Sequence, residues 1–129
     1  MHTIGTAAKL SGVNIETIRY YERVGVVPPP GRTASGRRVY DTESVSRLRF
    51  VKRCRELGFP IPEIKSLLGL TYGSPTSCAQ AREIGDAHLA AVHEKIRDLK
   101  RMERALSDLI ELCGNGEREC PMLKQLFAE

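Results

Sequence analysis

The chain has little aromatic content and no tryptophan. Among its 129 residues, 5% are Phe or Tyr and none is Trp, so few large rings are present to anchor an extensive core. A chain of this length suits one compact domain, or a small domain with an extended element. A large enzyme pocket is therefore not favoured, and no nucleophile–base pair or carboxylate pair stands out in the sequence. We predict that the protein is not an enzyme.

Signals for targeting or membrane insertion are also missing. The start of the chain, Met1 to Gly5, has no basic stretch followed by an apolar one. No apolar run approaches the roughly 20 residues that span a bilayer. We expect a cytoplasmic protein without a membrane partner.

Cysteine is scarce, and its placement raises a question. Two of the four cysteines, Cys113 and Cys120, enclose the segment CGNGEREC near the end of the chain. A disulfide, a metal site and coincidence are the three explanations. Because cytosolic thiols are kept reduced, a structural disulfide is the weakest of them.

Positive charge is concentrated in the first half of the chain. Residues 1–60 hold 11 Lys and Arg against 5 Asp and Glu, a net charge of +6, whereas residues 61–129 hold 9 against 11, a net charge of −2. A basic half is typical of proteins that bind phosphate backbones, although many soluble domains carry a few extra positive charges without such a partner.

The first segment predicts a helix-turn-helix. Apolar residues recur at near-helical spacing in TIGTAAKLSGV, which ends at Gly12 and Val13, and Asn14 is a candidate N-cap for a second helix, NIETIRYYERVGV. Two short helices around a glycine-containing turn form this motif.

The segment VPPPGRTASGRRVYD predicts a basic hairpin. Pro28 to Pro30 cannot continue a helix, and Gly36 lies at the tip between two short runs rich in Arg. Beside a helix-turn-helix, such a hairpin would be a wing that holds the DNA backbone, whereas in isolation a solvated loop is the more common interpretation.

Two further helices are expected to complete a small four-helix domain over residues 1–70. A cap candidate at Asp41 or Thr42 precedes a helix at 43–57, and PIPEIKSLLGL starts another with proline in its first turn. The first of these two helices repeats apolar residues at Val45, Leu48, Val51 and Leu57, with Phe50 and Cys54 on the flank.

A long helix is predicted for the second half. Residues 71–77 are turn formers and would be a linker, and residues 78–112 lack proline. Apolar residues in heptad spacing form a seam at Leu89, Val92, Ile96, Leu99, Leu106, Ile110 and Cys113. This seam needs a partner helix, and a second copy of the chain is the simplest source.

Taken together, ETIRYYERVGVVPPP, SGRRVY and RLRFVKRCRELGFPIPEIKSLL resemble the MerR family of transcription regulators. The resemblance implies a mostly α fold. A winged helix-turn-helix DNA-binding domain would be followed by a long dimerisation helix, paired as an antiparallel coiled coil, and by a metal-binding loop with a short terminal helix at 113–129. It also implies double-stranded promoter DNA, a second copy of the chain and RNA polymerase as partners.

The resemblance gives roles to exposed residues of the second helix and the hairpin. We expect Thr17, Arg19 and Tyr20 to face bases and backbone, because Arg pairs with guanine edges or phosphates. Arg37, Arg38 and Tyr40 would hold phosphates from the wing; the family commonly has an aromatic residue where Arg37 stands. The ring of Tyr21, by contrast, should point into the core.

The resemblance also extends to the cysteines. Cys113 and Cys120 match the metal-binding loop of the metal-responsive branch, in a slightly shorter version, and Cys78 lies where divalent-ion sensors have Cys and copper(I) sensors have Ser. In an antiparallel pair of helices, Cys78 of one subunit would meet Cys113 and Cys120 of the other. Three thiolates favour Hg(II) first, Cd(II) or Pb(II) next, and then Zn(II).

Other residues receive plainer interpretations. Cys54 is expected in the core, and His88 and His93 at solvated or packed positions on the long helix.

The leading hypothesis is a homodimeric regulator that binds a promoter palindrome and activates metal-resistance genes by distorting DNA when Hg(II) binds. The alternatives are a Cd(II)-, Pb(II)- or Zn(II)-sensing regulator of an efflux system and, from another class, a thiol redox sensor or metal-buffering protein.

Overall fold

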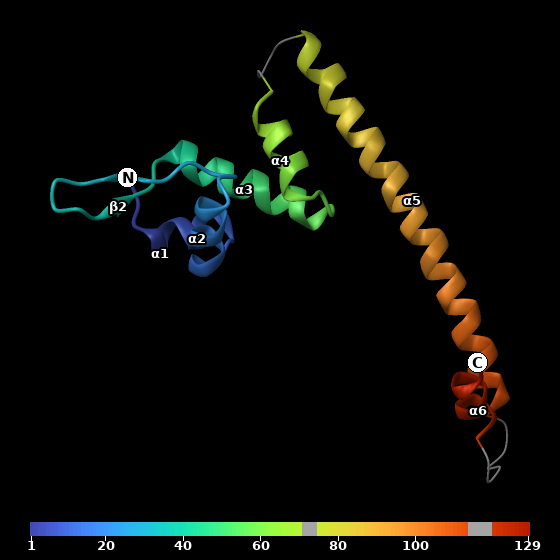
Figure 1. Cartoon of the computed structure of the whole chain (residues 1–129). Coiled ribbons are helices and arrows are strands. Elements are labelled where there is room, and N and C mark those ends of the chain that lie inside the picture. The colour runs from blue at the N-terminus through green and yellow to red at the C-terminus, as the bar shows by residue number, and fades with distance from the viewer. Residues whose placement is uncertain (71–74, 114–119) are drawn as a thin grey trace. The chain divides into compact units, whose positions relative to one another are not determined.

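The fold is described from a computed structural model, which covers residues 1–70, 75–113 and 120–129. The chain divides into two compact units, residues 1–84 and 85–129. The first unit holds four short helices and a hairpin, and the boundary between the units lies within a long helix (Figure 1).

Helices α1 (Ile4–Ser11) and α2 (Ile15–Arg23) form the predicted helix-turn-helix. Gly12 ends α1 with a φ of 76°, a left-handed conformation that glycine adopts without steric cost. The Asn14 side chain accepts a hydrogen bond of 2.8 Å from the backbone N–H of Thr17, so the predicted N-cap of α2 is confirmed.

A two-stranded antiparallel hairpin follows, and we call residues 31–40 the wing. Strand β1 (Gly31–Arg32) pairs with β2 (Arg38–Val39), and Gly36 turns the tip with a φ of 86°. Beyond β2, the backbone N–H and C=O of Tyr40 each form a 2.8 Å hydrogen bond with the backbone of His2. The start of the chain therefore holds the root of the wing.

Helices α3 (Thr42–Glu56) and α4 (Ile61–Leu68) complete the first unit. Asp41 caps α3 by accepting a 2.8 Å hydrogen bond from the N–H of Ser44. The apolar pattern was wrong at one position. Leu57, predicted as part of the apolar face of this helix, follows the last helical residue and is 67% exposed. Its neighbours earlier on α3, Leu48 and Val51, face inward as expected.

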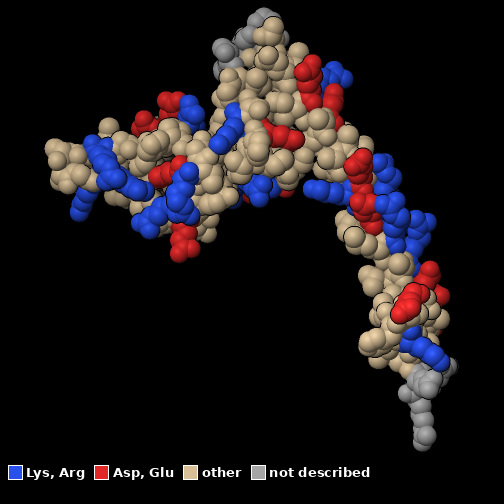
Figure 2. Space-filling view, in the orientation of Figure 1, with Lys and Arg blue, Asp and Glu red and all other residues tan. Residues whose placement is uncertain are grey.

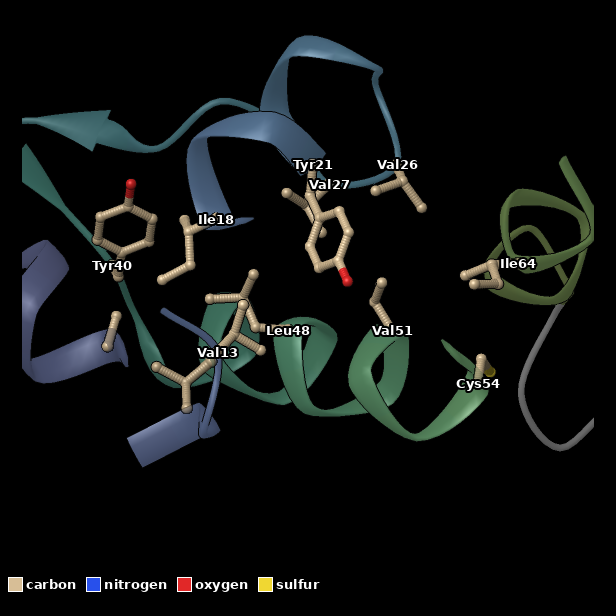
Figure 3. Packing of buried hydrophobic residues seen from close by; sticks show 12 residues of the cluster. Val13, Ile18, Tyr21, Val26, Val27, Tyr40, Leu48, Val51, Cys54 and Ile64 are labelled. Carbon is tan, nitrogen blue, oxygen red and sulfur yellow. The ribbon is translucent and has the colours of Figure 1, made fainter. Parts of the chain in front are cut away.

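A single hydrophobic cluster joins these elements. Ile18 and Tyr21 of α2 point toward Leu48 and Val51 of α3, and Ile64 approaches from α4 (Figure 3). Tyr21 is buried, so its predicted inward orientation is confirmed. The core thus fixes α2 by one face and leaves the other face available to solvent.

The long helix α5 spans Pro75–Leu112, and α6 spans Pro121–Phe127. Helix α5 begins three residues earlier than predicted, so residues 75–77 of the expected linker are helical, and residues 71–74 lie outside the described part. Proline needs no hydrogen-bond donor in a first helical turn, which is why Pro75 begins a helix here. None of the helices described is both long and apolar enough to span a membrane.

The predicted seam of α5 is largely exposed in the single chain. Five of its apolar residues are between 42% and 62% exposed: Leu89, Ile96, Leu99, Leu106 and Ile110. Exposed leucines and isoleucines in heptad spacing form the contact face of a coiled coil. The second unit therefore offers a large apolar stripe that its own described residues leave uncovered.

Candidate DNA-binding surface and thiol pair

The outer face of α2 carries the residues predicted to meet DNA. Arg19 and Tyr20 are exposed, and Thr17 is half-buried near the start of the helix. The guanidinium of Arg23 lies 5.9 Å from the centre of the Tyr20 ring, a cation–π distance. This face presents two arginines and one ring to solvent.

The wing divides its predicted DNA-binding residues between two environments. Arg37 is exposed at the tip, whereas Arg38 is half-buried and Tyr40 is 3% exposed. The Tyr40 hydroxyl donates a 2.8 Å hydrogen bond to Glu22 Oε1 of α2, and Arg38 Nη1 lies 3.3 Å from Glu22 Oε2. Tyr40 therefore does not face solvent in this structure.

Burial and the Glu22 carboxylate raise the pKa of Tyr40 to about 12, because both disfavour a phenolate. The hydroxyl therefore stays protonated and donates to Glu22 throughout the physiological range. Glu22 was not among the residues predicted from the sequence. The available signal was a lone carboxylate within the basic segment RYYERVG, which invites a search for its cationic partner.

An open cavity of about 360 Å³ lies between α2 and the wing. Four arginines and Glu22 line it together with two prolines: Arg19, Glu22, Arg23, Pro29, Pro30, Arg32 and Arg38. Figure 2 shows Lys and Arg gathered over the wing and the adjoining helices of the first unit. The predicted basic surface is thus concentrated where the two candidate DNA-binding elements meet.

The two loop cysteines lie close together. The Sγ atoms of Cys113 and Cys120 are 3.2 Å apart, and no disulfide joins them. Cys113 follows the last residue of α5 and Cys120 precedes the first residue of α6, so each thiol is attached to the end of a helix. The intervening residues 114–119 lie outside the described part.

The two thiols lie close enough to converge on one ion after a small separation. Sulfurs that bind an ion at about 2.3 Å lie about 3.8 Å apart in tetrahedral geometry and about 4.6 Å apart in linear geometry. The observed 3.2 Å is shorter than either distance, so the sulfurs would move apart by about 0.6 Å to hold one ion in tetrahedral geometry. Within the described residues of a single chain, no group of three His, Cys, Asp or Glu side chains forms a metal site.

The other cysteines and histidines occupy different surroundings. Cys78 is exposed in the first turns of α5, near the opposite end of that helix from Cys113. Cys54 is buried, as predicted, and burial raises the pKa of its thiol, which disfavours a metal-binding thiolate. His93 is exposed and His88 is buried.

Family models match most of the chain. The MerR HTH family regulatory protein model covers residues 2–70, and the model described as MerR, DNA binding covers residues 45–109. The chain is 44% identical over 126 residues to the mercuric resistance operon regulatory protein of Bacillus cereus, which covers 96% of each chain.

Solved structures give the same result. The transcription regulator PbrR691 from Ralstonia metallidurans CH34 in complex with lead(II) is 35% identical with a TM-score of 0.83, covering 98% of this chain and 99% of that one. MerR from Bacillus megaterium MB1 in complex with mercury(II) is 40% identical with a TM-score of 0.74, covering 95% of both chains. This chain therefore belongs to the MerR family of helix-turn-helix regulatory proteins and is a transcription regulator rather than an enzyme.

Proposed function

We propose that the protein is a metal-responsive transcriptional regulator. As a homodimer it binds a promoter palindrome, and it activates metal-resistance genes by distorting the DNA when a thiophilic ion, Hg(II) first, binds. The observation that carries this proposal is the pair of thiols 3.2 Å apart at Cys113 and Cys120. Its relatives support it, since they include a mercuric resistance regulator and structures with bound mercury(II) or lead(II).

The third thiol is supplied by the partner subunit. Helix α5 has 38 residues and is therefore about 57 Å long, and Cys78 and Cys113 belong to its opposite ends. A straight helix cannot bring its own two ends together. In an antiparallel pair, the start of one α5 lies beside the end of the other, and Cys78 then joins Cys113 and Cys120 of the partner.

The exposed seam of α5 supports the dimer. A stripe of leucine and isoleucine in heptad spacing gains the free energy of apolar burial when it packs against a second such helix. A two-fold pair of this kind is self-complementary, so one kind of interface suffices. The same interface would hold both metal sites.

The choice of ion follows from the number and softness of the ligands. Three thiolates and no described fourth ligand favour Hg(II), with Cd(II) or Pb(II) next and Zn(II) last, because Zn(II) usually takes four ligands. Bound ions would require Cys113 and Cys120 as thiolates, so binding releases protons.

DNA contacts are proposed for the exposed faces of α2 and the wing. Thr17, Arg19 and Tyr20 approach bases and backbone from α2, and Arg37 approaches a phosphate from the tip of the wing. Arg38 reaches the backbone from its half-buried position. Tyr40 takes part indirectly, because its hydroxyl is directed at Glu22.

Activation is proposed to act through the shape of the promoter. The dimer binds the DNA with and without the ion, and the ion-bound form bends and untwists it so that RNA polymerase can engage. Footprinting should then show continued protection of the operator together with new sites of hypersensitivity when Hg(II) is added. Simple release of the operator would contradict this mechanism.

A subunit-mixing experiment tests the shared metal site. The Cys78→Ser protein and the Cys113→Ser/Cys120→Ser protein should each bind DNA but lack the absorbance of Hg(II) held by three thiolates. The first variant keeps only the Cys113–Cys120 pair, which can hold Hg(II) in two-coordinate form, and the second keeps only Cys78 of the three. Mixing and reannealing the two should restore one site per heterodimer, because the three intact thiols then come from different chains. A Cys54→Ala variant is the control and should bind Hg(II) as the wild type does. No recovery in the mixture would exclude an intersubunit site.

The short sulfur–sulfur distance also supports a second candidate, a thiol redox sensor. A hydroperoxide would convert the two thiols to a disulfide and water and an alcohol, with the peroxide O–O bond broken and the sulfurs oxidised. Promoter output that responds to peroxide in a reporter strain but not to Hg(II) would favour this function over the metal sensor.

A further inference from the structure

Among the residues that the structure describes, Glu22 is the only carboxylate that lines the arginine-rich cavity between α2 and the wing. Its side chain is 9% exposed and contacts two wing residues. Oε1 accepts the Tyr40 hydroxyl at 2.8 Å, and Arg38 Nη1 donates to both oxygens, at 3.3 Å to Oε2 and 3.5 Å to Oε1. Hydrogen bonds to an ionised acceptor are about twice as strong as neutral ones. Glu22 therefore connects the second helix of the helix-turn-helix directly to strand β2 and the residue after it.

The root of the wing is held from a second direction as well. Tyr40 exchanges two backbone hydrogen bonds of 2.8 Å with His2, while its ring is packed in the core (Figure 3). The residues from Gly31 to Arg37 are all exposed. The wing is thus anchored at its root, through Arg38 and Tyr40, while residues 31–37 are exposed.

Anchoring the wing fixes the spacing of cationic groups. Arg19 and Arg23 project from α2 and Arg32 from β1, and all three line the cavity. Arg32 Nη1 donates a 2.9 Å hydrogen bond to the carbonyl oxygen of Gly36, which orients its guanidinium within the wing. If the wing moved away from α2, Arg32 would leave the other two arginines and the cavity would open.

We propose that Glu22 is a positioning residue for DNA binding, which anchors the wing to α2 through Tyr40 and Arg38 so that Arg19, Arg23 and Arg32 together surround one DNA phosphate. This inference rests on the proposed regulator function. The Glu22 carboxylate would then favour DNA binding, although its negative charge lies beside the expected path of the DNA phosphates.

The sign of a charge substitution separates this role from simple electrostatics. A carboxylate near a phosphate repels it, so replacing Glu22 with neutral glutamine should tighten DNA binding if charge alone mattered. If Glu22 positions the wing, the same substitution should weaken binding. Circular dichroism should show that the variant is completely folded at the assay temperature. A substitution that only lowers stability would then leave the DNA affinity unchanged.

The experiment compares Glu22→Gln and Tyr40→Phe with the matched control Glu43→Gln. Glu43 is 75% exposed and pairs with Arg47 at 3.4 Å, so its replacement removes one negative charge from the same unit without touching the wing. The probe is a fluorescent duplex of about 30 base pairs, selected on the full-length wild-type dimer from a random-sequence pool.

We expect both Glu22→Gln and Tyr40→Phe to bind the duplex at least about fivefold more weakly, and Glu43→Gln to bind it equally or more tightly. The slope of log affinity against log salt should fall by about one to two in the two wing variants, because phosphate contacts are lost. The double variant should be no weaker than the weaker single variant, since the two changes break the same link.

A measurement without DNA completes the test. Trypsin should cut after Arg37 severalfold faster in Glu22→Gln and Tyr40→Phe than in the wild type, because the wing is released. Two results would overturn the positioning role alone. One is unchanged cleavage after Arg37 in the wing variants, and the other is duplex binding by these variants as tight as that of Glu43→Gln, provided that the wild type binds the duplex. A wild type without salt-dependent duplex binding would overturn the regulator function and this role together. If Glu22→Gln does not fold, the duplex affinity and the cleavage rate of Tyr40→Phe test the positioning role.

Discussion

The two units of the chain differ in how they bury apolar surface. Every residue of the hydrophobic cluster lies between Ala7 and Ile64, in the first unit. In the second unit, the described leucines and isoleucines of α5 are mostly exposed, and so are Leu123, Leu126 and Phe127 of α6. A helix gains most of its stability from packing its apolar face. The first unit therefore carries its own core, whereas the second depends on a partner.

The largest expected effect comes from the core of the first unit. Leu48 is 1% exposed, so Leu48→Ala should lower the free energy of unfolding by about 2–5 kcal/mol through lost burial and a residual cavity. Urea unfolding at several protein concentrations should show the same loss at each. The matched change in α5, Leu106→Ala, should cost stability in a concentration-dependent way. A concentration-independent loss for Leu106→Ala would remove the distinction between the units.

The next effect concerns the partner of α5. Leu99 is 61% exposed in the single chain and belongs to the seam, so Leu99→Asp should raise the dimer dissociation constant about 10- to 100-fold by placing a charge in the interface. Analytical ultracentrifugation measures this directly. Lys100→Asp, one residue further along and off the seam, is the control and should leave the dimer intact. Equal effects of both changes would argue against the heptad interface.

A smaller effect tests whether a helix cap, in addition to the core, stabilises the first unit. Asn14→Ala removes the acceptor that caps α2, which should cost about 1 kcal/mol of stability. Asn14→Ser keeps a capping oxygen and should cost much less. Thermal unfolding followed by circular dichroism gives both values. An alanine variant as stable as the wild type would mean that packing of Ile18 and Tyr21 alone holds the helix.

The smallest effect is a pH dependence at the start of α3. Hydrogen bonding from the backbone N–H and side chain of Ser44 lowers the pKa of Asp41. A carboxyl group whose pKa is lower in the folded state stabilises the fold above the unfolded-state pKa of about 3.9 and loses that contribution as the pH falls through the folded pKa. Asp41→Asn should therefore flatten the acid limb of the stability curve. Identical acid limbs for the two proteins would contradict the cap's contribution.

Much of this architecture could be predicted from local signals in the sequence. The cap at Asn14, the turn at Gly12, the hairpin tip at Gly36 and the core positions Leu48 and Val51 all follow from rules that operate over a few residues. The MerR family resemblance followed from such motifs in combination, and the family models that match the chain confirm it.

Local sequence signals predicted only part of the candidate DNA-binding site. The family resemblance implies that Tyr40 holds a DNA phosphate from the wing. The structure instead buries Tyr40 and directs its hydroxyl to Glu22, 18 residues earlier. Contacts between residues so far apart in sequence leave no periodic pattern, and for that reason Glu22 was missed.

The sequence by itself determined the order of the elements, the uneven distribution of charge and the spacing of the cysteines, because each depends on residue type and on neighbours within a turn or two. Only the tertiary structure decided which residues of the wing face solvent and how close the Cys113 and Cys120 sulfurs lie. Both outcomes depend on how separate elements pack, since the wing is held by α2 and by His2, and the two thiols extend from the ends of two different helices.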